Sequence, residues 1–226
     1  MTARLLGVHQ DDQPAAITAR VPGSVWGREF VSKAGGGPLP ESTTEKQLVD
    51  LVLRKVKPHL DSGGGCVVSI KISMPSVFNG NWDSRLTAVG AALAGKNVEV
   101  VIWHEPEDDL TPNVFVPAHN RAREAIQDGG RGVLVDYAAM AYQWRPGSPT
   151  TADGGEWARD LQADRYLCDV YFGNSVPSTA TLATHPGLRR WLATMVLPYG
   201  RPWGLGEWGR RSDSGRAGQF AADFEW

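Results

Sequence analysis

The chain has 226 residues, of which 42% are hydrophobic, and its 23 Lys and Arg residues nearly balance its 25 Asp and Glu residues. This length and apolar content are enough to bury a core, which excludes disorder as the overall state. A formal net charge of -2 provides no basic surface to neutralise phosphates, so we expect no nucleic-acid partner. A neutral substrate fits this composition better.

The two cysteines, Cys66 and Cys168, are too few for a disulfide framework and lack the CxxC spacing of a zinc or redox site. Both begin apolar runs, so we expect buried free thiols. No stretch approaches the roughly 18 apolar residues of a membrane span, and no secretory signal opens the chain. We therefore expect no membrane association, and a protein that is cytoplasmic, carried on a virion or exported by a non-standard route.

Short apolar runs alternate with longer amphipathic segments along the chain. The β-branched run over residues 66–72 is typical of a buried parallel strand, and similar short runs recur at regular intervals. A Pro/Gly/Thr-rich stretch over residues 145–155 indicates a long loop. The expected strands are residues 5–8, 25–31, 66–72, 98–103, 132–137, 166–172 and 202–206.

Segments with helical spacing lie between these strands. Ser42-Thr43-Thr44-Glu45 matches a capping box and predicts a helix over about residues 43–59, which Pro58 ends. Thr111-Pro112 is a second helix start. The expected apolar helix faces are Leu86, Val89, Gly90 and Leu93; Phe115, Ala118, Ala122 and Ile126; and Leu188, Trp191, Leu192 and Met195.

Repeated strand–helix units imply a parallel sheet, either open and doubly wound or closed as a barrel. No GxGxxG or Walker sequence follows the first expected strand, which disfavours a nucleotide-binding open sheet. In a (β/α)₈ barrel, residues that follow the strands converge on the face that holds the active site. We therefore expect residues 1–226 to form one TIM-type (β/α)₈ barrel domain. The polar and aromatic residues that follow the strands are His9, Lys71, Glu105, Tyr142, Tyr171 and Glu207.

The end of the chain is short for a complete barrel. Only 226 − 207 = 19 residues follow Glu207, and Phe220, Ala221 and Phe224 suggest that they end in a helix. A last strand–helix pair needs more chain than that in barrels of about 250 residues. We expect the eighth strand to be absent or incomplete, or to come from the N-terminal segment or another chain. The open edge should then be covered by a partner chain or within a larger assembly.

Two strand ends deliver a glutamate. Glu105 follows an apolar strand, between His104 and Pro106, and Glu207 follows a short strand in a segment rich in Trp and Gly. Glycoside hydrolysis needs such a pair, because one carboxyl protonates the leaving oxygen while the other attacks the anomeric carbon or activates water. The neighbouring charges at 107–109 lie beyond the strand end, and we expect them to be solvated loop residues.

The His104-Glu105 pair and the segment Gly206-Glu207-Trp208-Gly209 resemble the two catalytic segments of clan A retaining glycosidases. Histidine before the first glutamate makes glycoside hydrolase family 26, the β-mannanase family, the nearest resemblance. Residues 80–83 and 169–173 are also similar to that family.

The resemblance implies a retaining mechanism without a cofactor, with Glu105 as general acid/base and Glu207 as nucleophile. His104 would hydrogen-bond the sugar or support the carboxylates, and Tyr171 would orient the nucleophile. The Trp-rich segment that commonly follows the His-Glu pair is replaced here by residues 106–109, so the resemblance does not extend to mannan as the substrate. We expect an endo-acting enzyme for a polysaccharide or oligosaccharide.

Several side chains beside the glutamates are candidates for binding the sugar. Trp82, Trp144 and Trp208 follow strands and suit stacking on sugar rings, as His9 and Tyr142 suit other substrate contacts. Lys71 is either a buried ion-pair partner or a substrate contact. The tryptophans expected in the core are Trp103, Trp191 and Trp203.

Two other functions remain open. A metal-dependent barrel hydrolase would use strand-end ligands, but neither HxH nor HExxH spacing is present, so we expect no metal. A non-catalytic carbohydrate-binding or structural barrel in a larger assembly, such as a phage tail, is the third possibility. The candidate metal ligands are His9, Asp11, Asp12, His104 and Glu105.

Overall fold

The computed structural model describes residues 26–148, 154–172, 176 and 180–210. Within them, six strands form one sheet in the order β1-β2-β3-β4-β5-β6, each parallel to the next. The predicted strands from residue 25 onward are confirmed, whereas the one at residues 5–8 and the helix at the C-terminus lie outside the described residues. The strands are Trp26–Val31 (β1), Gly65–Ile70 (β2), Val98–Ile102 (β3), Leu134–Met140 (β4), Tyr166–Phe172 (β5) and Trp203–Arg210 (β6).

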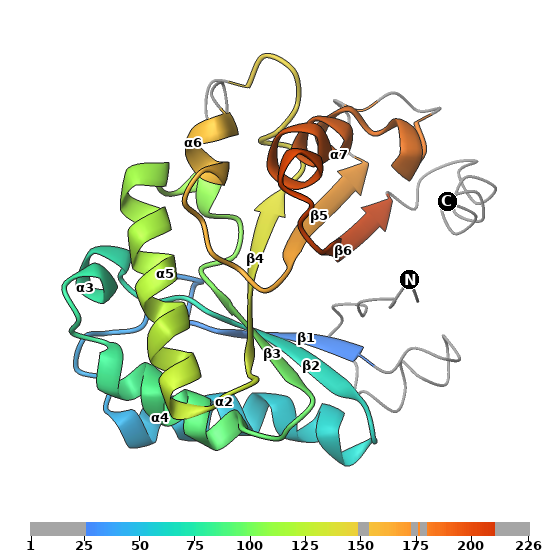
Figure 1. Ribbon diagram of the computed structural model, residues 1–226. Helices are drawn as coiled ribbons and strands as arrows, with labels where there is room; N and C mark the ends of the chain where they lie inside the picture. The colour runs from blue at the N-terminus through green and yellow to red at the C-terminus, as the bar shows by residue number, and fades with distance from the viewer. Residues whose placement is uncertain (1–25, 149–153, 173–175, 177–179, 211–226) are drawn as a thin grey trace.

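The sheet curls toward closure. Arg28 on β1 places its Nη1 2.8 Å from Oδ1 of Asp169 on β5, and its Nε lies 3.4 Å from Oε1 of Glu207 on β6. Since β1 and β6 are the two ends of the strand order, side chains can meet across it only if the sheet bends around a common interior. The described residues therefore form part of a (β/α) barrel, as the sequence predicts (Figure 1).

Helices alternate with the strands, and α2, α4 and α5 lie together on one side of the sheet (Figure 1). The α4–α5 contact is close because it is made at glycines. A Cβ on Gly90 would lie 1.9 Å from the Ile126 carbonyl oxygen, so a side chain there would push the two helices apart. The helices are Glu45–Asp61 (α2), Met74–Phe78 (α3), Asp83–Leu93 (α4), Pro112–Gly129 (α5), Gly154–Ala158 (α6) and Pro186–Trp191 (α7).

The predicted start and end of the first helix need correction. Its N-cap is Thr44, whose side chain accepts from the Gln47 N–H while the Gln47 side chain accepts from the Thr44 N–H. The capping box therefore lies two residues later than the one predicted at Ser42. The helix also continues past Pro58 to Asp61, because a proline in the last turn removes only one intrahelical hydrogen bond.

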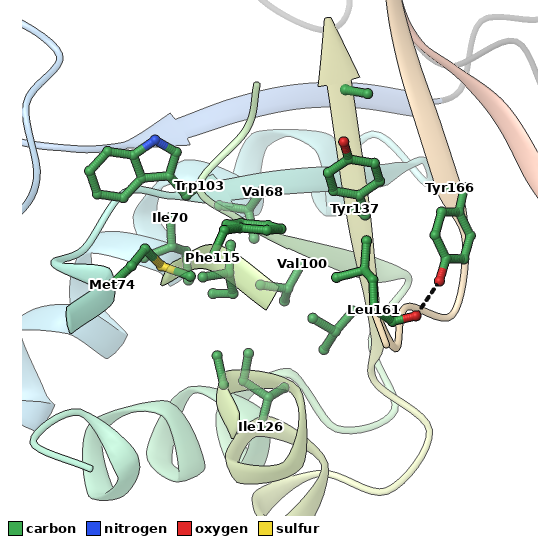
Figure 2. Packing of buried hydrophobic residues seen from close by; sticks show 14 of the residues in the cluster. Val68, Ile70, Met74, Val100, Trp103, Phe115, Ile126, Tyr137, Leu161 and Tyr166 are labelled. Carbon is green, nitrogen blue, oxygen red and sulfur yellow. Dashed lines mark hydrogen bonds between the residues drawn. The ribbon is translucent and has the colours of Figure 1, made fainter. Parts of the chain in front are cut away.

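The core has an outer and an inner layer, as expected for strands buried on both faces. Val68, Ile70 and Val100 face the helices, where Phe115 and Ile126 of α5 pack near them (Figure 2). Val67, Val101, Ala138 and Leu167 form the smaller inner cluster with Trp26. Cys66 and Cys168 are buried and form no disulfide, as predicted. No helix in the described part of the chain is long and apolar enough to cross a membrane.

A buried carboxyl pair lies in the barrel interior, on the same side of the strands as Val101 and Ala138. Glu99 on β3 is 2% exposed and its Oε1 lies 2.6 Å from Nη1 of Arg165, while Asp136 on β4 is fully buried. Burial, together with the negative charge of Glu99, raises the pKa of Asp136 well above its ordinary value. The folded protein therefore holds a proton on Asp136 that the unfolded chain releases.

Replacement of Asp136 by asparagine should change how stability depends on pH. The raised pKa means that wild-type stability falls as pH rises above about 4, by up to about 1.4 kcal/mol per pH unit. The variant lacks this proton, so the free energy of unfolding of the variant should increase relative to that of wild type as pH rises from 4 to 7. Urea unfolding at both pH values measures this. A pH-independent difference, equal to that of the exposed control Asp50→Asn, would contradict it.

Candidate active site

The backbone after β3 aims Glu105 toward the barrel interior. Trp103 and Glu105 have φ angles of 55° and 52°, in the left-handed region that non-glycine residues seldom adopt. The Glu105 N–H donates to the Ala138 carbonyl at 2.8 Å, and the Trp103 N–H donates to Ile70 at 3.0 Å. Such backbone persists only where its surroundings impose it, and it is concentrated at functional sites.

A β-bulge places Glu207 on the inner face of β6. Cys168 pairs with Leu205 but Asp169 pairs with Glu207, so Gly206 is the extra residue. Without the bulge, Glu207 would pair with Val170, whose side chain faces the outer core. Only glycine fits at the bulge, because a Cβ there would lie 2.3 Å from Asp169 Oδ1. Glu207 therefore lies within a longer strand than the sequence predicts.

Arg28, Asp169 and Glu207 form a charged cluster under the strand ends. The side chains of Arg28 and Asp169 are 2% and 1% exposed, and that of Glu207 is 14% exposed. The Tyr171 hydroxyl donates a hydrogen bond to Oε2 of Glu207. Burial raises the pKa of Asp169 to about 6, although the Arg28 charge opposes that rise. A cation and a hydroxyl donor thus stabilise negative charge on Glu207.

The surroundings of Glu105 favour its protonated form. Burial, followed by the negative charges of Asp169 and Glu207, raises the pKa of Glu105 to about 8, while Arg28 acts against this. Glu105 is therefore protonated at neutral pH and can donate its proton. A carboxyl group that keeps its proton at neutral pH, beside a second carboxyl group, is the arrangement that general acid catalysis requires.

His104 is neutral at physiological pH. Burial, then the positive charges of Arg28 and Lys71, lowers the pKa of His104 to about 4. Its ring packs edge-on against Phe30, with the centroids 4.7 Å apart, and its buried Nδ1 has no hydrogen-bond partner among the described residues. This nitrogen has no partner and no exposed surface in the described part of the chain, so the role of His104 as a sugar contact stays a prediction.

Lys71 is an ion-pair partner, which is one of its two predicted roles. Its Nζ lies 2.8 Å from Oδ2 of Asp109 and 4.8 Å from the centre of the Trp103 ring. The Trp103 Nε1–H also donates to Asp109, at 3.2 Å. The Lys71 hydrogen bond lowers the pKa of Asp109, which is 46% exposed, so Asp109 is the solvated loop charge that the sequence predicts and is also paired with Lys71.

Three other predictions about side chains near the strand ends are wrong. Trp82 and Trp144 are fully buried and cannot stack on a sugar: Trp82 packs beneath the Arg85 guanidinium, and Trp144 donates its Nε1–H to Glu107. Glu107 is itself 2% exposed rather than solvated. The sequence shows how far each of these residues stands from a strand, but not toward which side its side chain points.

The other predicted residues have different outcomes in the structure. Tyr142 is exposed, with the Arg145 guanidinium 3.6 Å from its ring centre, and its role as a sugar contact stays a prediction. His9 and the Trp208 side chain lie outside what is described, and so do Asp11 and Asp12. Among the predicted core tryptophans, Trp103 and Trp191 are buried, but Trp203 is 37% exposed, so its core assignment is wrong.

Sequence reasoning missed Arg28 and gave Asp169 no role. Arg28 has a sequence signal: it occupies the inward position between Trp26 and Phe30, where a neutral residue would be expected in a buried strand. Its partner Asp169 is 141 residues away, and nothing in the sequence pairs them.

The described residues contain no group of three or more His, Cys, Asp or Glu side chains placed to hold a metal ion. Two surface hollows, one lined mainly by α4 and α5 and the other by α2 and the segment between β1 and α2, include neither Glu105 nor Glu207. The carboxyl cluster at the strand ends is thus the part of the described structure with the strongest catalytic character.

No protein-family model and no curated protein matches the chain. Its fold is similar to that of solved glycoside hydrolases. The catalytic domain of an endoglucanase from Thermobifida fusca, in complex with cellotetraose, aligns with a TM-score of 0.61 and 13% identity over 96% of this chain and 69% of that chain. An exo-β-1,4-mannosidase from Opitutaceae bacterium strain TAV5 aligns with a TM-score of 0.61 and 14% identity over 90% and 42%.

The GH5_18 enzyme from Streptomyces cattleya, in complex with GlcNAc, aligns with a TM-score of 0.50 and 16% identity over 68% of this chain and 44% of that chain. The chain therefore spans less than half the length of this enzyme and of the mannosidase. These structures do not single out family 26. The chain therefore has the (β/α)-barrel fold of these glycoside hydrolases, of which it spans only a part.

Proposed function

We propose that the protein is a clan A retaining glycoside hydrolase that cleaves a polysaccharide at internal bonds, with Glu105 as general acid/base and Glu207 as nucleophile. The observation that carries the proposal is the single cluster in which Glu105 is protonated while Glu207 is held by Arg28 and Tyr171. The fold likeness to endoglucanase and mannosidase structures supports it. Family 26 is supported only by the His104-Glu105 motif.

The two carboxyl groups divide the reaction into two displacements. In the first, the Glu105 proton goes to the glycosidic oxygen as that bond breaks, and a Glu207 oxygen bonds to the anomeric carbon. In the second, Glu105 takes a proton from water, which attacks the same carbon and releases Glu207. Tyr171 and Arg28 orient Glu207 for both steps, and no cofactor takes part.

The substrate that fits best is a neutral β-linked glycan. Lys71, a cation near the site, is already paired with Asp109, so it offers little to an anionic sugar. The neutral His104 suits a sugar hydroxyl. The half-exposed rings of Tyr142 and Tyr171 are suited to aromatic contacts with sugar rings.

Incubation with cellulose, β-glucan, mannan, xylan and chitin, followed by a reducing-end assay, tests the proposal. We expect new reducing ends from at least one glycan, oligosaccharide products, no change after EDTA, and loss of activity as pH rises through about 8, where Glu105 loses its proton. Binding without cleavage would favour the non-catalytic barrel. Loss of activity in EDTA that a divalent ion restores would favour the metal hydrolase.

A further inference from the structure

Glu107 is a buried carboxyl group that the proposed mechanism does not use. It lies in the short 3₁₀ turn Pro106–Asp108, two residues after Glu105. Its Oε1 accepts hydrogen bonds from the Tyr137 hydroxyl and, at 3.3 Å, from the Trp144 Nε1–H. Its Oε2 accepts from the Met140 N–H at 3.4 Å. All three donors belong to β4 or to the loop after it, so one side chain fastens the turn to the neighbouring strand.

The surroundings of Glu107 are otherwise apolar and aromatic. Figure 2 shows the Tyr137 ring along β4 beside Phe115, with its hydroxyl oxygen toward the arrowhead end of the strand. Tyr137 and Trp144 are both fully buried. A carboxyl group is costly in such a place, and an apolar residue of similar size commonly gives equal or greater stability. Stability alone therefore does not account for a glutamate here.

The turn that Glu107 fastens also carries Glu105. Trp103 and Glu105, on either side of His104, adopt the left-handed backbone conformation, which is unfavourable for a non-glycine residue. The chain could relax by rotating these residues, and that would turn the Glu105 side chain away from Glu207. The hydrogen bond that the Glu105 N–H donates to Ala138 and the one that the Glu107 carboxyl accepts from Tyr137 oppose this relaxation.

We propose that Glu107 is a positioning residue: by accepting hydrogen bonds from Tyr137 and Trp144, it holds the turn after β3 so that the Glu105 carboxyl stays in the cluster with Glu207 and Asp169. This inference rests on the proposed function for its kinetic consequence. The effect of Glu107 on the position and surroundings of Glu105 does not depend on any substrate. Burial raises the pKa of Glu107 to about 7, and above that pH its negative charge adds a small part to the raised pKa of Glu105.

The first test is Glu107→Gln, which keeps an acceptor for Tyr137 and removes the charge. In a ¹³C NMR titration of labelled glutamate carboxyl groups, assigned by loss of the Glu105 signal in Glu105→Gln, we expect the pKa of Glu105 to fall from its wild-type value. We also expect kcat to fall roughly 10- to 100-fold with little change in KM, because a displacement near 1 Å has an effect of that size. The exposed control Glu124→Gln, on α5, should change neither quantity.

Tyr137→Phe is a second variant that keeps Glu107 and removes only one donor. This variant should also lower kcat, and it tests the proposal if Glu107→Gln does not fold. An unchanged Glu105 titration and unchanged kcat in the folded variants would overturn the proposal, as would a loss of thermal stability alone. If wild type hydrolyses no glycan, the proposed function fails, while the titration still decides whether Glu107 sets the surroundings of Glu105.

Discussion

Replacement of Glu207 by alanine should lower kcat by roughly 10⁴-fold or more on every substrate that the wild type cleaves. The reason is that the neighbouring carboxyl group, Asp169, is 1% exposed and paired through its Oδ1 with Arg28 below the strand ends, so it cannot reach the anomeric carbon in place of Glu207. Initial rates on natural glycans and on aryl glycosides measure the effect, with thermal melting to confirm that the variant is folded.

The matched control is Glu156→Ala, which removes an exposed glutamate on α6 and should keep wild-type rates. Turnover by Glu207→Ala above one percent of wild type would assign the nucleophile to another group. A variant that melts far below wild type would instead point to a structural role for the ion pair with Arg28.

Replacement of Arg28 by methionine should be the most destabilising single change at the site. It leaves Asp169 buried without a counter-charge, and breaking a buried pair in this way typically lowers stability by about 3–5 kcal/mol. Asp169 already has a pKa of about 6, above its unfolded value, and loss of the Arg28 charge raises it further. The folded variant must then keep Asp169 protonated, so the destabilisation should be larger at pH 8 than at pH 5.

Urea unfolding at the two pH values measures this effect. The double variant Arg28→Met with Asp169→Leu should recover most of the lost stability, because it removes the orphaned charge as well. Arg121→Met is the control, since it breaks an exposed, solvent-screened pair with Asp83 and should change stability far less than Arg28→Met does. A loss that is small, or equal at pH 5 and pH 8, would contradict this account of the cluster.

The strands could be predicted from the sequence because they are buried on both faces. Residues 66–70 and 98–102 are short apolar segments between glycines and helices, and such segments fit few structures other than a buried strand. Helix starts were less certain, because Ser42 and Thr44 are each followed three residues later by Glu or Gln. Which of the two caps the helix depends on tertiary packing.

The two glutamates were visible in the sequence because each stands near a strand end in a distinctive motif. Arg28 was not assigned, because its partners are brought to it only when the sheet curls. The sequence predicts a solvated Glu107 because acidic runs usually face solvent. A 3₁₀ turn directs neighbouring residues to different sides, and Glu107 is on the buried side. The prediction that Trp82 and Trp144 are exposed fails for a related reason. Their distance from a strand in the sequence does not show which helices and loops cover them.

The most direct test of the central claim uses Glu105→Ala, an activated aryl glycoside and added azide. If Glu105 is the general acid and Glu207 the nucleophile, the variant retains glycosyl transfer from the aryl substrate, which needs no proton to leave. Azide then attacks the covalent intermediate, and ¹H NMR should show a glycosyl azide with the anomeric configuration of the substrate. An inverted azide, or equal loss of activity on activated and natural substrates, would contradict the assignment.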